Sequence, residues 1–510
     1  MNLSARAWFR KWHKWPSLVL SLFILLFALS GIVLNHRAYF SSISVNRNCL
    51  PPIYRYKNWN LAAVKGGLRL NQDTTLVYGN IGIWISDSSL AHFSDNNQGL
   101  PKGIDHRKVN SMAVAPNGDL YAGTLFGLYY KGKQQQSWTK ITLPIEEERI
   151  VKLLMVKEKL WVMSRSYLLS GFPQGIRSHF ERINVPPGED DDQKAGLFKT
   201  LWVIHSGEIY GMLGRYFVDF VAFVFIFLTS SGFYYFLTPY FLKKSGEKAK
   251  ANFRRVFKFN LRWHKRFGSW LIVILLLTTL SGVFLRPPLL IAIANSRVGK
   301  IPNSLLDDPN PWYDKFRDIL VDDSAHRILF ATSEGIYYSG DSLKNPLISF
   351  PIQPEVSVMG INVLEKVRSG EYLVGSFSGL FRWIPASAYI EDYITKEVKS
   401  GVQEFGKPFG NVVVAGYIRQ AKREILFDYA TGAFALQQGV PIVRMPEEVL
   451  RATPMSLWSL SLEIHTCRIY EFLIGNFYIL MIPLTGIGIA FSFVTGYFSW
   501  YKGRRIKRYY

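Results

Sequence analysis

Residues 261–288 read LRWHKRFGSWLIVILLLTTLSGVFLRPP and place a histidine, His264, just before a long apolar run. The run at 268–286 is long enough to cross a bilayer core, which takes about 20 helical residues. Three more apolar runs lie near 16–35, 216–240 and 472–500. The sequence therefore predicts a membrane protein with a bundle of four transmembrane helices.

The four apolar runs form two related pairs. WHKWPSLVLSLFILLFALSGIVL, beginning at Trp12, matches WHKRFGSWLIVILLLTTLSGVFL, beginning at Trp263. HSGEIYGMLGRYF at 205–217 matches HTCRIYEFLIGNF at 465–477 in the same way. Ser-Gly pairs, typical of close helix packing, occur at 30–31, 231–232 and 281–282. We expect two copies of one unit, each made of a span, an outer domain and a second span.

Positive charge is concentrated beside the apolar runs. The stretches 1–15, 243–266 and 502–508 hold 18 of the net 22 positive charges of the chain. Lysine and arginine are enriched on the cytoplasmic side of spans, so we expect these stretches and both termini to be cytoplasmic. This explanation of the charge argues against nucleic-acid binding. The first run is longer than a signal-peptide core, and we expect it to be a retained span.

A histidine introduces each apolar run. His13 and His264 precede runs that start inside the cell, so we expect them at one height; His205 and His465 should share a second height near or above the outer face. Two neutral imidazoles at one height are what a six-coordinate haem iron needs on its two axial sides. The sequence thus predicts two haem groups, the first with iron ligands His13 and His264, the second with His205 and His465. Cytoplasmic arginines are suited to pair with haem propionates. No catalytic residue is identified.

The height of the outer pair above the cytoplasmic end of the spans depends on whether the helices are straight. About 35 helical residues separate His205 from the basic end of its span, which corresponds to roughly 50 Å at 1.5 Å per residue. Bending would shorten the gap at three glycines, which are Gly207, Gly211 and Gly214. His36, whose counterpart in the second copy is Pro287, lies at an intermediate height. Whether His36 is an axial ligand stays open.

A strand, a glycine turn and an aromatic strand recur in the outer connections. The six copies are 76–86, 120–132, 160–171, 329–340, 372–383 and 425–436. Their spacing of roughly 40 to 50 residues is typical of propeller blades. We expect an all-β, propeller-like extracytoplasmic domain of six blades, built jointly by the two long loops. Two separate three-hairpin sheets are the alternative, although a half-propeller leaves exposed strand edges.

The predicted domains follow from these boundaries. They are 1–36 (cytoplasmic N-terminus and first span), 37–204 (first half of the blades), 205–290 (second and third spans with the basic loop), 291–464 (second half of the blades) and 465–510 (fourth span and basic tail).

The remaining polar features predict no further site. We expect the acidic runs 145–149 and 188–194 to be solvated loops. Four histidines outside the spans lack ligand spacing: His92, His106, His179 and His326. Cys49 and Cys467 both lie in the outer part of the chain, where a disulfide is permitted, and their pairing is left open.

At these residues the sequence resembles the PepSY-associated transmembrane helix family. The resembling features are H-x₁₆-S-G at 13–31 and 264–282 and H-[ST]-x-x-I-Y from 205 and from 465. Members include inner-membrane ferric-siderophore reductases with two b-type haems between four spans. The resemblance implies a multi-pass protein of the bacterial inner membrane, a periplasmic outer domain and the two histidine pairs given above. The chain departs from the family in its propeller-like blades and in Cys467, where a small residue or glycine is expected.

The expected function is transmembrane electron transfer through two b-type haems to an extracytoplasmic acceptor, a ferric chelate or siderophore, as in a membrane haem-dependent reductase. The short cytoplasmic loop has no nucleotide-binding motif. The electron donor would then be a cytoplasmic protein, a diffusible flavin or a quinol from the bilayer. The alternative is a non-redox, membrane-anchored propeller that binds an envelope ligand or partner protein. The sequence leaves the donor, the acceptor and the oligomeric state undetermined.

Overall fold

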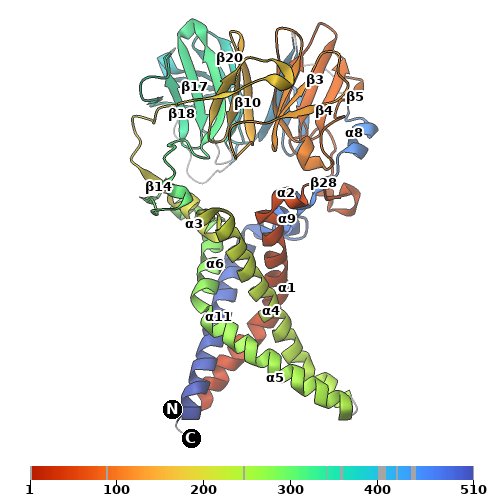
Figure 1. Cartoon of the computed structure of the whole chain (residues 1–510), viewed down its shortest axis with the longest axis vertical. Helices are drawn as coiled ribbons and strands as arrows, with labels where there is room; N and C mark the ends of the chain where they lie inside the picture. Colours follow the sequence, from red (N-terminus) through yellow and green to blue (C-terminus); the bar gives the residue numbers. More distant parts are fainter. Residues whose placement is uncertain are drawn as a thin grey trace. The chain divides into compact units, whose positions relative to one another are not determined.

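The computed structural model describes residues 3–87, 90–244, 247–340, 342–356, 360–399, 409–420, 423–437 and 444–508. The chain divides into a helical unit and a β unit (Figure 1). The helical unit comprises Met1–Phe40, Gln193–Asp308 and Leu457–Tyr510, and the β unit comprises Ser41–Asp192 and Pro309–Ser456. Each unit is therefore assembled from separate parts of the sequence.

Seven helices make up most of the helical unit. They are α1 (Leu3–Asn35), α3 (Leu197–Ser206), α4 (Gly211–Lys244), α5 (Glu247–Trp270), α6 (Ile272–Phe284), α9 (Leu457–His465) and α11 (Tyr478–Arg508). Helix α1 packs against α4, α9 and α11, and α6 packs against α3 and α11. Shorter elements of this unit are α2 (Arg37–Phe40), α7 (Leu289–Ile293), α10 (Glu471–Ile474) and the ribbon of β14 (Lys194–Gly196) with β15 (Arg297–Gly299).

Three helical segments in the described part of the chain are long and apolar enough to cross a membrane. They are Ala5–Asn35, Glu208–Lys243 and Arg468–Lys502. The third run predicted from the sequence is different, because Phe253–Trp270 and Ile272–Phe284 meet at an angle of 66°. Helix α6 alone, at about 20 Å, is shorter than a bilayer core. Large apolar side chains such as Leu213 and Val273 point outward from these helices, as expected for contact with lipid.

The chain turns sharply just after His205 and just after His465. Gly207 ends α3 with a φ of 77° and leads into a 3₁₀ turn, Glu208–Tyr210, before α4 begins. A Cβ atom at Gly207 would lie 2.1 Å from the carbonyl oxygen of Gly214, so only glycine fits this position. The equivalent Cys467 has a φ of 57°. The expectation that about 35 continuous helical residues separate His205 from the basic end is therefore wrong, because α3 and α4 are separate helices.

In the described residues, the β unit contains six antiparallel sheets of three to five strands, besides one two-stranded pair. The first is β2 (Gly66–Arg69), β3 (Thr74–Gly79), β4 (Gly82–Asp87) and β5 (Phe93–Asp95), and the second is β6 (Val109–Val114), β7 (Leu120–Thr124), β8 (Gly127–Lys131) and β9 (Thr139–Ile141). The third is β10 (Ile150–Val156), β11 (Lys159–Ser164), β12 (Leu168–Gly171) and β13 (Glu181–Ile183), and the fourth is β16 (Phe316–Asp322), β17 (Arg327–Thr332), β18 (Gly335–Ser339) and β19 (Ile348–Ser349). The fifth is β20 (Ile361–Arg368), β21 (Glu371–Ser376), β22 (Gly379–Ile384), β23 (Tyr389–Asp392) and β24 (Val398–Lys399), and the sixth is β25 (Val414–Gln420), β26 (Arg423–Asp428) and β27 (Gly432–Ala435).

All six predicted hairpins are present, each as the second and third strands of a sheet. The first strands contact one another in the order β2, β6, β10, β16, β20 and β25, and β25 also contacts β2. The six sheets of the β unit therefore form a closed circuit of contacts. A strand pair, β1 (Ser44–Val45) with β28 (Met455–Ser456), and the helix α8 (Glu447–Ala452) complete the unit.

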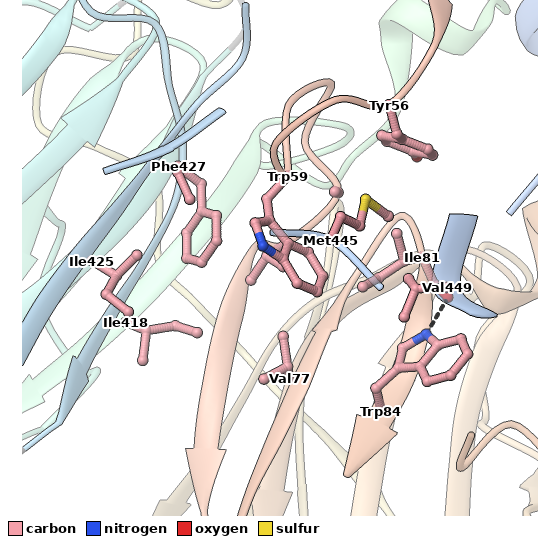
Figure 2. Close-up of a cluster of buried hydrophobic side chains, with 13 residues drawn as sticks. Tyr56, Trp59, Val77, Ile81, Trp84, Ile418, Ile425, Phe427, Met445 and Val449 are labelled. Carbon is pink, nitrogen blue, oxygen red and sulfur yellow. Dashed lines mark hydrogen bonds between the residues drawn. The ribbon is translucent and has the colours of Figure 1, made fainter. Parts of the chain in front are cut away.

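The core of the β unit includes the place where its first and last sheets meet (Figure 2). Ile418 and Phe427 from the last sheet face Val77 and Trp84 from the first, and the cluster is buried from solvent. The Trp84 Nε1 donates a hydrogen bond of 3.0 Å to the Ile81 carbonyl oxygen, which satisfies its buried N–H group. Residues more than 300 positions apart thus share one core.

The acidic run 145–149 and the two cysteines differ from, or complete, what the sequence suggested. The run 145–149 is not simply solvated, because the Glu148 carboxylate pairs with Lys140 at 2.5 Å and Glu147 Oε2 is buried without a hydrogen bond in the described part of the chain. Cys49 and Cys467 are both free thiols, so the structure contains no disulfide between them.

Candidate functional site

The four histidines that introduce the apolar runs form two couples in the helical unit. His13 on α1 and His264 on α5 have ring centres 6.1 Å apart, with an angle of 66° between the ring planes. His205 at the end of α3 and His465 at the end of α9 have ring centres 6.1 Å apart and an angle of 59°. The structure thus brings together the same pairs that the duplication predicted. We call them the inner couple and the outer couple.

In three of the four rings, Nδ1 is held by a backbone carbonyl group of a neighbouring helix. His13 Nδ1 donates to the Ser492 carbonyl oxygen at 2.8 Å. His205 Nδ1 donates to the Thr278 carbonyl oxygen at 2.9 Å. His465 Nδ1 lies 3.1 Å from the carbonyl oxygen of Phe27 and 2.9 Å from Ser30 Oγ. A carbonyl oxygen only accepts, so Nδ1 carries the proton in these rings.

The fourth ring, His264, reaches the same state through a serine. Its Nδ1 lies 2.8 Å from Ser231 Oγ, while that hydroxyl donates to the Leu228 carbonyl oxygen at 3.1 Å. The serine oxygen therefore accepts from Nδ1. In a neutral imidazole with the proton on Nδ1, Nε2 has a free lone pair. Metal-binding histidines characteristically donate their other N–H to a backbone carbonyl or similar acceptor, and all four rings have this second contact.

A glycine backs each histidine ring. A Cβ atom on Gly282 would lie 2.7 Å from His205 Cε1, and one on Gly496 would lie 2.9 Å from His13 Cε1. A Cβ atom on Gly31 would lie 3.5 Å from His465 Cε1, and one on Gly232 would lie 3.9 Å from His264 Cε1. The sequence had marked three Ser-Gly pairs for helix packing but missed Ser492 and Gly496, which have no Ser-Gly spacing.

The couples have the spacing expected for two ligands of one metal ion. Two imidazoles bound through Nε2 on opposite sides of a metal, at about 2 Å per bond, place their ring centres about 6 Å apart. Zinc sites take three or four protein ligands, and the described residues contain no group of three or more His, Cys, Asp or Glu side chains suited to a metal. A bare pair fits a metal whose other positions are filled by a cofactor, as in haem. The residues present therefore fit haem iron.

The distance between the couples follows from α1, which contributes to both. His13 belongs to the inner couple, and Ser30, seventeen residues later on the same helix, contacts His465 of the outer couple. At 1.5 Å per residue the two levels are about 25 Å apart. This is half the separation estimated from the sequence, because the chain reverses at Gly207 and at Cys467.

His36 is not part of either couple in the structure. Its Nε2 contacts the Asp219 carboxylate on α4, and its ring stacks on Tyr216 with ring centres 5.6 Å apart. Asn35 Nδ2 donates to the same carboxylate at 3.4 Å and to the Ser206 carbonyl oxygen at 3.2 Å. The contact explains how Asp219 is tolerated in an apolar helix, since a charge in such a segment needs a partner.

Buried charges in the β unit join neighbouring sheets. Lys152 on β10 forms an ion pair with Asp318 on β16 at 2.9 Å. Glu365 on β20 lies near this pair, and burial raises the pKa of its carboxyl group above the ordinary value. These groups bridge successive first strands and assign no ligand.

Comparison with solved structures finds only distant likenesses. The extracellular domain described as that of a hybrid two component system from B. thetaiotaomicron aligns with a TM-score of 0.37 and 10% identity, over 73% of this chain and 32% of that one. A GH74 xyloglucanase from Xanthomonas campestris aligns with a TM-score of 0.36 and 10% identity, over 75% and 46%. PorZ of the type-IX secretion system of Porphyromonas gingivalis aligns with a TM-score of 0.32 and 10% identity, over 74% and 38%. The chain spans less than half the length of these three proteins, and the likenesses are too weak to carry an argument.

Comparison with curated sequences finds no match. The model of a protein family described as the PepSY-associated TM region matches residues 172–503. The match covers well over half of the chain, including three of the four paired histidines, and it confirms the resemblance noted in the sequence. The chain belongs to the PepSY-associated TM region family.

Proposed function

We propose that this protein transfers electrons across a membrane through two b-type haems, the first held by His13 and His264 and the second by His205 and His465. The observation that supports the proposal most is the spacing of 6.1 Å in both couples, together with Nδ1 contacts that leave every Nε2 free. Packing alone gives no reason for two unrelated levels of the bundle to repeat this arrangement.

The haem supplies reversible one-electron chemistry at its iron. The chain supplies the rest. The carbonyl oxygens of Ser492, Thr278 and Phe27 fix the tautomer and the plane of each ring they contact. The apolar helices around the couples keep water away and lower the local dielectric constant, and both influence a metal's reduction potential. The histidines that would hold the two haems lie at levels about 25 Å apart along α1.

The proposal includes an architecture and an orientation. Helices α5 and α6 would together form a fourth, bent span, and the six sheets would form a six-bladed propeller. The basic stretches would lie in the cytoplasm of a bacterial cell, with the propeller in the periplasm and the spans in the inner membrane. The closed circuit of strand contacts supports the propeller, and the position of the basic residues supports the orientation.

For the acceptor we propose a ferric chelate of the siderophore class, on the strength of the family resemblance. One-electron reduction to ferrous iron weakens binding by hard oxygen ligands and releases the metal. The donor would be a cytoplasmic protein, a diffusible flavin or a quinol.

A redox cycle of the purified protein tests the proposal. The oxidised protein should be red, its Soret band should shift on addition of dithionite, and a ferric chelate should then reverse the shift while a ferrous-iron indicator develops colour. A reduced protein that a ferric chelate does not reoxidise would rule out this acceptor. A colourless protein from haem-replete cells would instead favour a membrane-anchored binding module.

A further inference from the structure

The two sides of the outer couple carry different charges, although they come from equivalent parts of the duplicated chain. Aligning LSGIVLN with LSGVFLR makes Asn35 and Arg286 counterparts, and aligning HSGE with HTCR makes Glu208 and Arg468 counterparts. The first copy thus has a neutral and an acidic residue where the second has two arginines. The fold itself does not require arginine at these positions, since the first copy places its own histidine of the outer couple, His205, without one.

Arg286 is a cation without a protein counter-ion. In the part of the chain that the structure describes, its guanidinium group makes no hydrogen bond and no ion pair. It is partly buried, and its electrostatic neighbours are Tyr478, Arg468, Glu463 and Cys467. Leaving a cation unpaired within an apolar helical unit is costly, so a counter-ion from elsewhere is expected.

The carboxylate among these neighbours, that of Glu463, is already engaged. Arg468 Nε and Nη2 donate to the two oxygens of Glu463 at 2.5 Å and 2.6 Å. The Glu463 side chain is only 8% exposed, so this bidentate pair is well shielded. Arg286 therefore adds a net positive charge beside it. Gly282, only four residues before Arg286, lies against the ring of His205, which places the arginine near the outer couple.

We infer that Arg286, supported by Arg468, is a binding site for a carboxylate beside the outer couple. A guanidinium group offers paired N–H donors that match the two oxygens of a carboxylate. The carboxylate has two candidate sources, and both depend on the proposed function. It is either a propionate of the outer haem or a carboxylate of a ferric chelate at its acceptor site. The counterpart Asn35 offers no such group, because its amide is engaged by Ser206 and Asp219.

Three variants test the site: Arg286→Gln, Arg286→Lys and, as a matched control, Arg215→Gln. Arg215 is an arginine of the same helical unit that already has a partner, Glu208 at 2.7 Å. If the carboxylate is a propionate, Arg286→Gln should lose the outer haem or lower its midpoint potential, whereas Arg286→Lys should retain most of both. Arg215→Gln should match the wild type.

A second readout separates the two sources. If the carboxylate belongs to the acceptor, Arg286→Gln should keep both haems at wild-type potentials. Its KM for ferric citrate should rise about tenfold, equivalent to about 1.4 kcal/mol, with kcat unchanged. Its KM for a ferric hydroxamate chelate that has no carboxylate should stay the same. If Arg286→Gln equals Arg215→Gln in haem content, midpoint potential and both KM values, the inference is wrong.

The inference stays testable if the protein proves to be haem-free. Citrate should then raise the Tm of the wild type and not that of Arg286→Gln, measured at equal ionic strength. No shift in the wild type, or equal shifts in both proteins, would overturn the carboxylate site. A colourless wild type would by itself contradict only the proposed function.

Discussion

At the scale of single residues, the candidate site depends on glycines that allow a histidine ring to lie against a helix backbone. The space between a Cβ atom added at the glycine and the histidine ring differs between positions. The Cβ position of Gly282 is 2.7 Å from His205, closer than carbon atoms approach in proteins, whereas that of Gly232 is 3.9 Å from His264, an ordinary contact. Both glycines belong to Ser-Gly pairs whose serine also contacts the histidine ring, which makes them a matched pair for mutagenesis.

We predict that Gly282→Ala displaces His205 and that Gly232→Ala leaves His264 in place. If the couples bind haem, Gly282→Ala loses the outer haem or changes its spectrum from low-spin to high-spin. Gly232→Ala keeps the wild-type spectrum. Absorption spectra of the reduced proteins measure both. Equal spectra for the two variants would show that the glycine contacts do not position the rings.

A second residue-scale prediction concerns Glu147 in the β unit. Burial, only partly offset by Arg149 and Arg165, raises the pKa of this carboxyl group to about 7. The folded state therefore holds the proton more tightly than the unfolded state, and the stabilising effect of protonation is lost as the pH rises from about 4.5 to about 7. By this linkage ionised Glu147 costs up to about 3 kcal/mol at pH 8.

Glu147→Gln should remove that penalty. We expect the variant to be more stable than the wild type at pH 8 and equally stable at pH 4, with a flatter profile between them. Thermal unfolding of the β unit across this pH range provides the measurement. A variant less stable than the wild type at pH 8 would mean that the arginines around Glu147 hold it ionised.

The pairing of the four histidines could be predicted from the sequence, because equivalent positions in a duplicated unit share a height in the membrane. Their Nδ1 contacts could not, since Ser492 and Phe27 acquire their roles only through the register between packed helices. The contact of His36 with Asp219 was also missed, because the equivalent positions in the second copy are Pro287 and Ile479, which form no polar pair.

At the scale of secondary-structure elements, the reversal between α3 and α4 sets the level of the outer couple. Hydropathy and helix periodicity predicted one long helix here, because residues with positive φ change neither the hydropathy nor the periodicity of a sequence. Three glycines were the available signal, and two of them, Gly207 and Gly211, have positive φ in the structure. The bend of 66° between α5 and α6 was also hidden, because it occurs at Leu271 (φ −98°, ψ 11°), an apolar residue inside an uninterrupted apolar run.

We predict that Gly207→Ala destabilises the helical unit by at least about 1 kcal/mol, from the left-handed backbone cost alone. The added Cβ would also meet the Gly214 carbonyl oxygen at 2.1 Å. Gly196→Ala, at the start of α3, is the control: its φ is −62° and its Cβ would meet nothing within 4 Å. Thermal unfolding in detergent compares the two. If Gly207→Ala is as stable as Gly196→Ala, the reversal does not depend on glycine.

At the scale of the whole molecule, the β unit is closed by contact between its first and last sheets. Ile418 lies in that contact and is 3% exposed. The repeated motif allowed six hairpins to be predicted from the sequence, but not which sheets meet, because that contact joins residues more than 300 positions apart. The strand circuit in the structure supplies this information.

Removing side-chain volume at the closing contact should weaken the whole β unit. We predict that Ile418→Ala costs about 2 to 5 kcal/mol, the usual range for a buried isoleucine. The control is Ile348→Ala on β19, where the side chain is 37% exposed and the cost should be below that range. Denaturant unfolding followed by tryptophan fluorescence reports on Trp59 and Trp84 in the same cluster. Equal losses in both variants would contradict closure through Ile418.

The ratio of haem to protein chain is the most direct test of the central claim that each histidine couple holds one haem. The account predicts two haems per chain in the wild type and one in each of His13→Ala, His264→Ala, His205→Ala and His465→Ala. Replacement of His92, whose side chain is 90% exposed, should leave two. A wild type without haem, or a His205 or His465 variant that retains both, would contradict it.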